Sequence, residues 1–274
     1  MRIEYVSDQE EMMLKDFILL KGVSKALARK IKLYGKMYIN NEESKNYFLV
    51  KKGDLVTLEY DEVLNEEILV NSESLDIQYE DEHILVVNKR KDLASQPSRL
   101  HQFDNLISLV KAYYLEKGIK TNIHLVNRLD YSTSGLVIVA KDGFTHHALS
   151  STHIIKKYYA LVSGHLEKKS DEINLKIGRV VEHNIKRWVM EDGKESITKY
   201  KVIKEFDDSS LLEIELVTGR THQIRVSFAY LNHSLIGDKL YGEGSDLKLC
   251  CYYLKFKNPF NDSFVEVEIK PDWA

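Results

Sequence analysis

The segment 124–142, HLVNRLDYSTSGLVIVAKD, most constrains how this chain of 274 residues can fold. A polar loop containing Asp130 leads through a Ser-Thr-Ser-Gly turn into the unbroken apolar run Leu136–Ala140. A short apolar run bounded by turn residues is typical of a strand buried on both faces. The sequence therefore predicts that Asp130 lies at the edge of a sheet, held by local hydroxyl and amide groups. An Asp before Ser, Thr and Gly is, on this evidence alone, also a common turn former.

Residues 75–274 are predicted to form one domain of mixed secondary structure. Helices are expected near 104–118 and 222–232, each bounded by capping or turn residues. Because strands dominate and the helices do not alternate regularly with them, an α+β domain is favoured over a doubly wound sheet. Six runs have the composition of strands: Ile84–Val87, Leu136–Ala140, Tyr158–Val162, Thr198–Val202, Leu211–Leu216 and Phe264–Ile269.

The N-terminal part contains a basic amphipathic helix, predicted over residues 23–36 with Ser24 as N-cap and Gly35 near its end. Leu27, Ile31 and Tyr34 recur at helical spacing on the packing side. The opposite side, called the basic face below, consists of Lys25, Arg29, Lys32 and Lys36. Such a face can follow a phosphate backbone, or it can simply be solvated surface.

Short strands are expected after this helix, at Met37–Ile39, Tyr47–Val50 and Leu55–Tyr60. The acidic stretch 61–74 lacks strong periodicity and suits a linker or a peripheral strand. The sequence thus predicts a module at residues 1–60, a linker at 61–74 and a larger domain at 75–274. A domain has about 150 residues on average, so a chain of 274 residues is expected to form about two domains.

Composition excludes several protein classes. The 39 basic and 42 acidic residues give a net charge of −3, which does not indicate a chain coated with positive charge for nucleic acid. No apolar stretch approaches the length of about 20 residues that a membrane span needs, and the start of the chain lacks a signal-peptide pattern. Cys250 and Cys251 are adjacent and are expected to be buried and unpaired. We therefore expect a cytoplasmic protein that has no contact with membranes.

Common catalytic motifs are missing from the sequence: it has no phosphate-binding glycine loop, no dinucleotide fingerprint, no H-E-x-x-H and no G-x-S-x-G. The histidines around His146, His147 and His153 lack carboxylates or cysteines at ligand spacing. They are expected to be ordinary surface histidines, so no metal site is predicted.

A second polar segment, VTGRTHQIRV at 217–226, supplies Arg220, His222, Gln223 and Arg225. A carboxylate that stays ionised in a partly dry pocket needs a fixed cation nearby, and the planar guanidinium suits that role. Arg225 is the candidate partner for Asp130. An ordinary surface ion pair is the alternative reading of Arg225.

These motifs together resemble a known family. NRLDYSTSGLVIVAK resembles the H-R-L-D-x-x-T-S-G-L signature of the RluA-type pseudouridine synthases, and TGRTHQIRV with LIGDKLYG at 235–242 is similar to a later motif of that family. KKYYALV at 156–162 resembles its K-x-Y-x-A-L-V strand. Two positions depart: Asn127 stands where the family usually has His, and Lys89-Arg90-Lys91-Asp92 replaces K-P-x-G, which leaves open how the substrate-entry loop is shaped.

The resemblance implies a pseudouridine synthase fold, in which a long, mostly antiparallel mixed sheet with flanking helices is crossed by a cleft. It implies that Asp130 is the catalytic carboxylate, attacking ribose or base or abstracting a ribose proton, with Arg225 as its ion-pair partner. Tyr158 is implied to stack on the uracil and to assist proton removal from carbon 5; a packed strand aromatic is the alternative. Arg128 is implied to fill the gap left by the extruded uridine. Asn127, Arg220, His222 and Gln223 are further candidates for substrate binding.

Residues 12–60 resemble a small RNA-binding domain shared by a ribosomal small-subunit protein and many RNA-modifying enzymes. The predicted function is therefore isomerisation of uridine to pseudouridine in structured RNA by a monomer, with large-subunit rRNA as the first substrate and tRNA as the alternative. No cofactor is predicted, because a carboxylate is already anionic at neutral pH. A non-catalytic RNA-binding protein with the same fold and a glycosidase, which normally needs two carboxylates, are the competing classes.

Overall fold

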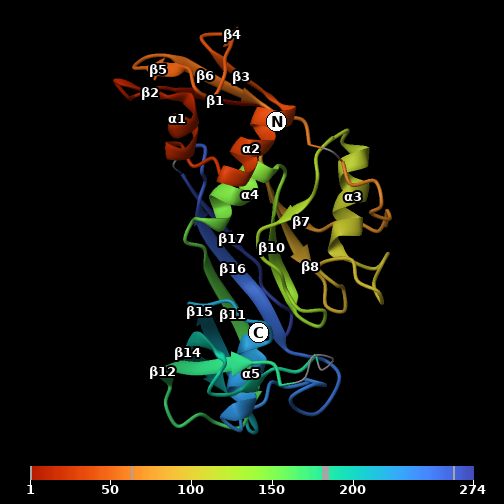
Figure 1. Ribbon diagram of the computed structural model, residues 1–274. Helices are drawn as coiled ribbons and strands as arrows, with labels where there is room; N and C mark the ends of the chain where they lie inside the picture. Colours follow the sequence, from red (N-terminus) through yellow and green to blue (C-terminus); the bar gives the residue numbers. More distant parts are fainter. Residues whose placement is uncertain (1, 63, 181–184, 262) are drawn as a thin grey trace.

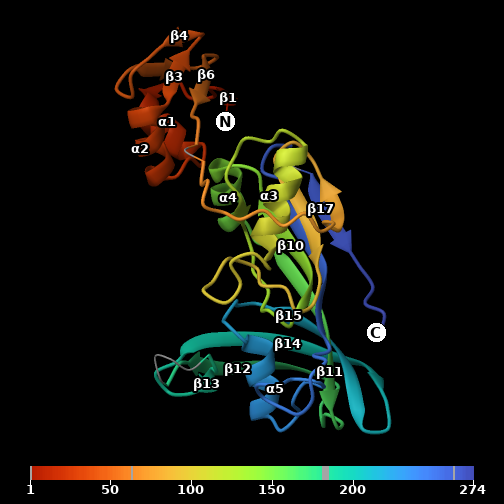
Figure 2. The ribbon, with the colours of Figure 1, turned by 90° about the vertical axis from the view of Figure 1, so that its right-hand side faces the viewer.

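The computed structural model describes residues 2–62, 64–180, 185–261 and 263–274. Three parts follow one another along its length: the N-terminal module, then a half built on β8 (Ile84–Lys89) and β10 (Ser134–Ala140), then a half built around β14 (Lys194–Glu205) (Figures 1 and 2). The long strands β11 (Ile155–Ser163) and β16 (Leu249–Lys257) connect the last two parts.

The N-terminal module has two helices and two small sheets. Its four-stranded sheet is antiparallel in the order β1-β6-β3-β4, and β2 pairs with β5. The elements are β1 Arg2–Val6, β2 Glu11–Met13, α1 Leu14–Leu20, α2 Lys25–Tyr34, β3 Lys36–Ile39, β4 Glu42–Glu43, β5 Leu49–Lys51 and β6 Leu55–Glu59. Its buried cluster includes Phe17 and Ile31, and also Phe144 from the larger domain.

The basic helix is shorter than predicted. The Ser24 hydroxyl accepts a hydrogen bond from the Leu27 amide (3.1 Å), which starts α2 as expected. The helix ends at Tyr34 and Gly35 follows in extended conformation, at a position where a Cβ would lie 2.2 Å from the Glu59 carbonyl oxygen. Lys36 therefore begins β3 and is not on the helix. Every residue of the basic face is exposed.

The larger domain is one mixed sheet with the order β13-β12-β14-β15-β11-β16-β10-β8-β7, to which β17 and β9 add at β16 and β10. Among the described strands of this sheet, β10 and β16 form the parallel pair and the other pairs are antiparallel. The α+β prediction is confirmed. The remaining elements are β7 Ile77–Glu80, α3 Leu106–Glu116, β9 His124–Leu125, α4 Gly143–Ser150, β12 Ser170–Gly178, β13 Trp188–Val189, β15 Ser209–Leu216, α5 Gln223–Tyr230 and β17 Phe264–Glu268.

The parallel pair joins the two halves of the sheet. Gly135 on β10 is opposite Cys251 on β16, and φ at Gly135 is +115°. A Cβ there would lie 2.3 Å from the Cys251 carbonyl oxygen, so only glycine permits this approach. The polar loop before β10, which contains Asp130, is thereby held where the two halves meet.

Helices cover each half of the sheet separately. Helices α3 and α4 lie along the half with β8 and β10, while α5 packs near β12, β13 and β14 (Figure 2). Strand β10 is buried from Gly135 to Ala140, as its apolar run predicts. Both cysteines are buried and unpaired, as predicted. In the part of the chain that the structure describes, no helix is long and apolar enough to span a membrane.

Ten elements were not predicted from the sequence: β1, β2, α1, β4, β7, β9, α4, β12, β13 and β16. Strand β16 is buried almost throughout and so lacks the alternation that marks a half-exposed strand. Strand β12 contains the alternation Ile173, Leu175 and Ile177, which is the pattern of a half-exposed strand and was overlooked in the sequence. The predicted strand Tyr47–Val50 is β5, which starts at Leu49.

Candidate active site

A cleft of about 890 Å³ lies where the two halves of the sheet meet. One wall is formed by the loop 95–98 and by residues 125–130, and the other by residues 216–225 with Arg187. Lys156 and Tyr158 of β11 and Leu249 of β16 also line it. The two segments that the sequence singled out, which are about 90 residues apart in the chain, therefore face one cavity.

Hydrogen bonds to the backbone of Leu129 and Asp130 hold the loop that carries the catalytic candidate. The buried Ser95 hydroxyl donates to the Leu129 carbonyl (2.6 Å) and accepts from the Leu129 amide (3.1 Å). The Thr133 amide then donates to the Asp130 carbonyl (3.1 Å), which closes the predicted turn. The Asp130 side chain keeps 27% exposure, so its carboxylate is open to the cleft.

Two side chains from the second segment approach that carboxylate. Nη1 of Arg225 lies 3.7 Å from Oδ2 of Asp130, and Nε2 of His222 lies 3.8 Å from the same oxygen. Neither contact is a tight hydrogen bond, so Asp130 is faced by positive and polar groups without being saturated by them. This leaves the carboxylate oxygens available to a substrate.

The guanidinium of Arg225 is held by another residue, Asp238. Nε and Nη2 of Arg225 donate to the two carboxylate oxygens of Asp238 (2.8 and 2.6 Å), and both side chains are almost fully buried. The amides of Leu240 and Tyr241 also donate to Asp238. The bidentate fork therefore belongs to the Asp238 pair, and Arg225 presents only its remaining nitrogen to Asp130.

Burial would disfavour the charges of both partners, but the hydrogen bonds between them outweigh it. They raise the pKa of Arg225 and lower the pKa of Asp238. Sequence reasoning did not single out Asp238, although the motif LIGDKLYG that contains it was recognised. Its spacing from Arg225 gave no sign of the pairing.

His222 stands directly before α5 with a left-handed backbone, φ +57°. Its Nδ1 lies 2.8 Å from the Tyr241 hydroxyl, and that hydroxyl accepts the Arg187 amide (2.6 Å). Burial lowers the pKa of His222, which favours the neutral ring. A neutral ring whose Nδ1 accepts the Tyr241 proton carries its own proton on Nε2, the atom that faces Asp130.

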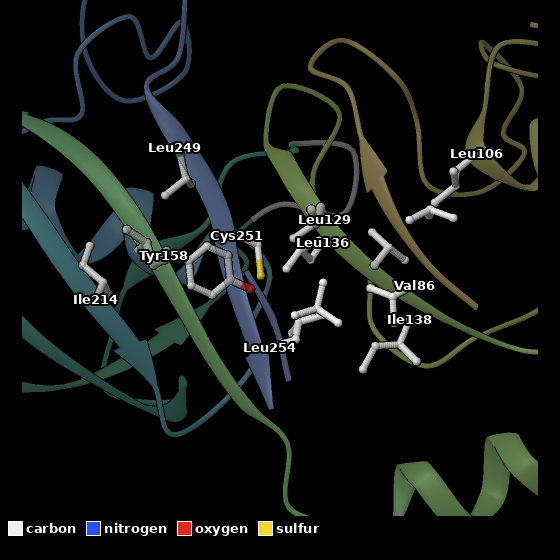
Figure 3. Packing of buried hydrophobic residues seen from close by; sticks show 14 of the residues in the cluster. Val86, Leu106, Leu129, Leu136, Ile138, Tyr158, Ile214, Leu249, Cys251 and Leu254 are labelled. Carbon is white, nitrogen blue, oxygen red and sulfur yellow. The ribbon is translucent and has the colours of Figure 1, made fainter. Parts of the chain in front are cut away.

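Tyr158 lies in the middle of β11 with 6% exposure, and its ring borders the cleft. Figure 3 shows its hydroxyl directed toward Cys251. Burial raises the pKa of Tyr158 well above its ordinary value, so the hydroxyl is protonated at neutral pH. The ring lines the cleft with little exposed surface, and the raised pKa disfavours an unassisted role as a base.

Asn127 and Gln223, both predicted to bind substrate, line the cleft but use their amide groups within the protein. The Asn127 side chain donates to the Leu136 carbonyl (3.2 Å) and accepts from the Ile138 amide (2.7 Å). The Gln223 side chain makes four such contacts, including one with the Arg220 amide (2.9 Å). These two side chains therefore stabilise the walls of the cleft.

The two arginines predicted to bind substrate, Arg128 and Arg220, are more exposed than Asn127 and Gln223. Nη1 of Arg128 donates to the Gln96 side chain (3.3 Å) at the edge of the cleft, and Nε of Arg220 donates to the Glu195 carbonyl (3.0 Å). Both side chains are exposed. No residue of the basic face of the N-terminal module lines the cleft.

Lys89, the first residue of the stretch that departs from K-P-x-G, is buried. Its amine donates to the carbonyls of Leu93 (2.8 Å), Arg90 (3.0 Å) and Tyr131 (3.3 Å). Burial lowers the pKa of Lys89 to about 7. The amine ties the end of β8 to the loop that carries Asp130. The unusual stretch after Lys89 therefore keeps this tie although its sequence departs from K-P-x-G.

The fold and this cleft define a class of enzyme that acts on RNA bases. Residues 83–230 match the family model of RNA pseudouridylate synthases. The chain is 38% identical over 237 residues to an uncharacterised RNA pseudouridine synthase of Bacillus subtilis, YjbO, covering 84% of each chain. It is 35% identical over 245 residues to ribosomal large subunit pseudouridine synthase D of Blochmanniella floridana, covering 82% of this chain and 74% of that one.

Among solved structures, the human RNA pseudouridylate synthase domain containing 1 superposes with a TM-score of 0.61 at 26% identity. The superposition covers 74% of this chain and 86% of the human one. The chain belongs to the RNA pseudouridylate synthase family, and it is an RNA pseudouridine synthase. The family and the activity predicted from the sequence are confirmed.

Proposed function

We propose that the substrate is structured large-subunit ribosomal RNA and that Asp130 is the catalytic carboxylate. The observation that carries the catalytic assignment is the position of Asp130 in the cleft, with Arg225 and His222 at 3.7 and 3.8 Å from Oδ2. The choice of rRNA is supported by relatives named ribosomal large subunit pseudouridine synthase D.

The reaction breaks the bond between uracil N1 and the ribose and forms a bond from ribose to carbon 5, while the proton on carbon 5 leaves and N1 gains one. Asp130 serves as nucleophile or base. Nη1 of Arg225 supplies a positive charge that faces Oδ2 of Asp130. The Nε2 proton of His222 is placed to hydrogen-bond the carboxylate or an oxygen of the nucleotide.

The charge of the cleft supports an RNA substrate. Its lining includes five basic residues and, among the described residues, a single carboxylate. The basic residues are Arg128, Lys156, Arg187, Arg220 and Arg225. Positive charge in a cleft attracts phosphate even though the chain as a whole is slightly negative. A glycosidase would need a second carboxylate at about 5 Å or more from Asp130.

The other candidate residues receive more specific roles. The ring of Tyr158 stacks on the target uracil, and Arg128 at the cleft edge occupies the gap left in the RNA. Arg220 contacts the backbone from the opposite wall. Asn127 and Gln223 act as positioning residues, because their side-chain amides hold strands β10 and β14 and the turn at Arg220.

The N-terminal module, residues 1–60, is proposed to dock RNA through the basic face, with 61–74 as the connection to the catalytic domain. Support comes from the exposure of all four basic side chains and from the absence of helix and strand in the described part of 61–74. The enzyme is proposed to act as a cytoplasmic monomer, which light scattering of the purified protein with and without RNA would check.

The test is mapping of pseudouridine in total RNA from cells that carry the wild-type gene, no gene or the Asp130→Asn variant. Asparagine is nearly isosteric but neither attacks nor accepts a proton at this position. We expect sites in large-subunit rRNA that disappear in both the deletion and the variant. Sites lost only from tRNA would overturn the rRNA assignment, and sites retained by the variant would overturn the role of Asp130.

A further inference from the structure

The loop before α3 forms a compact turn beside the cleft. Ser98 and His101 exchange backbone hydrogen bonds (3.4 and 3.1 Å), which leaves Arg99 and Leu100 at the tip. The side-chain amide of buried Asn105 donates to the carbonyls of His101 and Gln102 (3.1 Å each). Because Asn105 also caps α3, the turn is anchored to a rigid element.

An aromatic pair connects this turn to the catalytic loop. The His101 ring stacks on Tyr131, with centroids 4.7 Å apart and planes at 29°. Tyr131 directly follows Asp130, and its carbonyl accepts the Lys89 amine. The turn 98–101 together with Tyr131 is called the aromatic lip below. Ser98 lines the cleft itself, so the lip forms part of its edge.

The aromatic lip leaves apolar surface in water. Tyr131 is 42% exposed and Leu100 is 87% exposed. Arg99 is exposed at the tip, and Arg128 lies nearby on the cleft wall, where it contacts Gln96. Aromatic and apolar groups beside arginines suit unstacked nucleotides, because every base has a π face and every nucleotide carries a phosphate.

We propose that the aromatic lip binds a base of the RNA strand that flanks the extruded uridine, with that base stacked on Tyr131 and its phosphate near Arg99. Extrusion of the uridine unstacks its neighbours, so a platform beside the cleft recovers stacking that the RNA loses. Tyr131 occupies an unspecified position of the H-R-L-D-x-x-T-S-G-L signature, so the signature itself does not require an aromatic residue there, and the lip is proposed to contribute to the choice of RNA. The inference rests on the proposed function.

The kinetic test uses an rRNA transcript labelled with tritium at uracil carbon 5 and measures single-turnover release. We expect Tyr131→Ala to lower the single-turnover rate at subsaturating enzyme about tenfold, since stacking accounts for most of its contact with RNA. Tyr131→Phe keeps the ring and should stay within about twofold of wild type. Phe264→Ala removes an aromatic residue with 66% exposure on β17, far from the lip, and should change nothing. Equal rates for Tyr131→Ala and wild type, or equal losses in the Ala and Phe variants, overturn the proposal.

A second measurement separates contact with RNA from support of the Asp130 loop. Total RNA from cells grown with 4-thiouridine is irradiated with the Asp130→Asn protein, and crosslinked peptides are sequenced by mass spectrometry. The proposal predicts crosslinks at Tyr131, His101 or Leu100. If the lip has only a structural role, no crosslinks form there, and that result overturns the proposal. If wild type releases no tritium from rRNA, the rRNA assignment fails, and the crosslinks still decide whether the lip binds RNA.

Discussion

The buried pair of Arg225 and Asp238 should determine both the stability of the cleft and the orientation of the guanidinium. Asp238→Asn keeps the shape of the side chain but removes its charge and one of the two acceptors for the guanidinium. Both side chains are at most 4% exposed, so Arg225 would be left buried without a full counter-charge. Breaking a buried ion pair costs about 3–5 kcal/mol. We take the lower end, about 3 kcal/mol, because the amide still accepts one hydrogen bond.

The assay is urea unfolding followed by circular dichroism at pH 7, with Asp246→Asn as the control. Asp246 is also paired with lysines, but its side chain is 58% exposed, so its loss should cost less than about 1 kcal/mol. For Asp238→Asn, a loss of about 3 kcal/mol corresponds to a fall in Tm of about 6–12 °C. A loss no larger than that of the control would refute the reasoning.

The same pair gives a pH dependence with a definite sign. Although burial favours the neutral acid, the hydrogen bonds from Arg225 hold the pKa of Asp238 below 3.8. A carboxyl whose pKa is lower in the folded state stabilises the protein above its unfolded pKa, and this contribution is lost as pH falls through the folded pKa. The stability difference between wild type and Asp238→Asn should therefore be constant above about pH 5 and shrink below about pH 4. A difference that persists at pH 2 would contradict the ion-pair explanation.

Three further outcomes are expected. Arg225→Ala should be severely impaired in single-turnover isomerisation at saturating RNA. Arg225→Lys should be intermediate, because lysine keeps the charge near Asp130 but cannot bridge both Asp238 oxygens. Equal rates for the three proteins would make Arg225 structural. Replacing the four residues of the basic face by Gln should weaken RNA binding and flatten its salt dependence by about 0.7–0.9 in log–log slope per lost contact, with the rate on bound RNA unchanged; an unaltered slope would identify the face as solvated surface. Wild type should gain stability from pH 7 to pH 10, because Lys89 loses its proton near pH 7 in the folded state but near 10.5 in the unfolded chain, and this rise should be missing in Lys89→Met.

The sequence was most informative where local chemistry decides the structure. Ser24 starts α2 because a hydroxyl cap acts within one turn of chain. The apolar run after the Ser-Thr-Ser-Gly turn became the buried strand β10 for the same reason. The family signature identified the enzyme class because it lies in contiguous stretches of sequence.

Only the tertiary structure decided which groups meet. Nothing in the chain near Arg225 indicates that its fork binds Asp238 and leaves one nitrogen for Asp130. Asn127 looked like a substrate ligand, but its amide pairs with the backbone of β10. The stacking of His101 on Tyr131 joins residues 30 positions apart. Side-chain partners are set by packing between distant segments, so local sequence determines which groups are available and the fold determines which of them react.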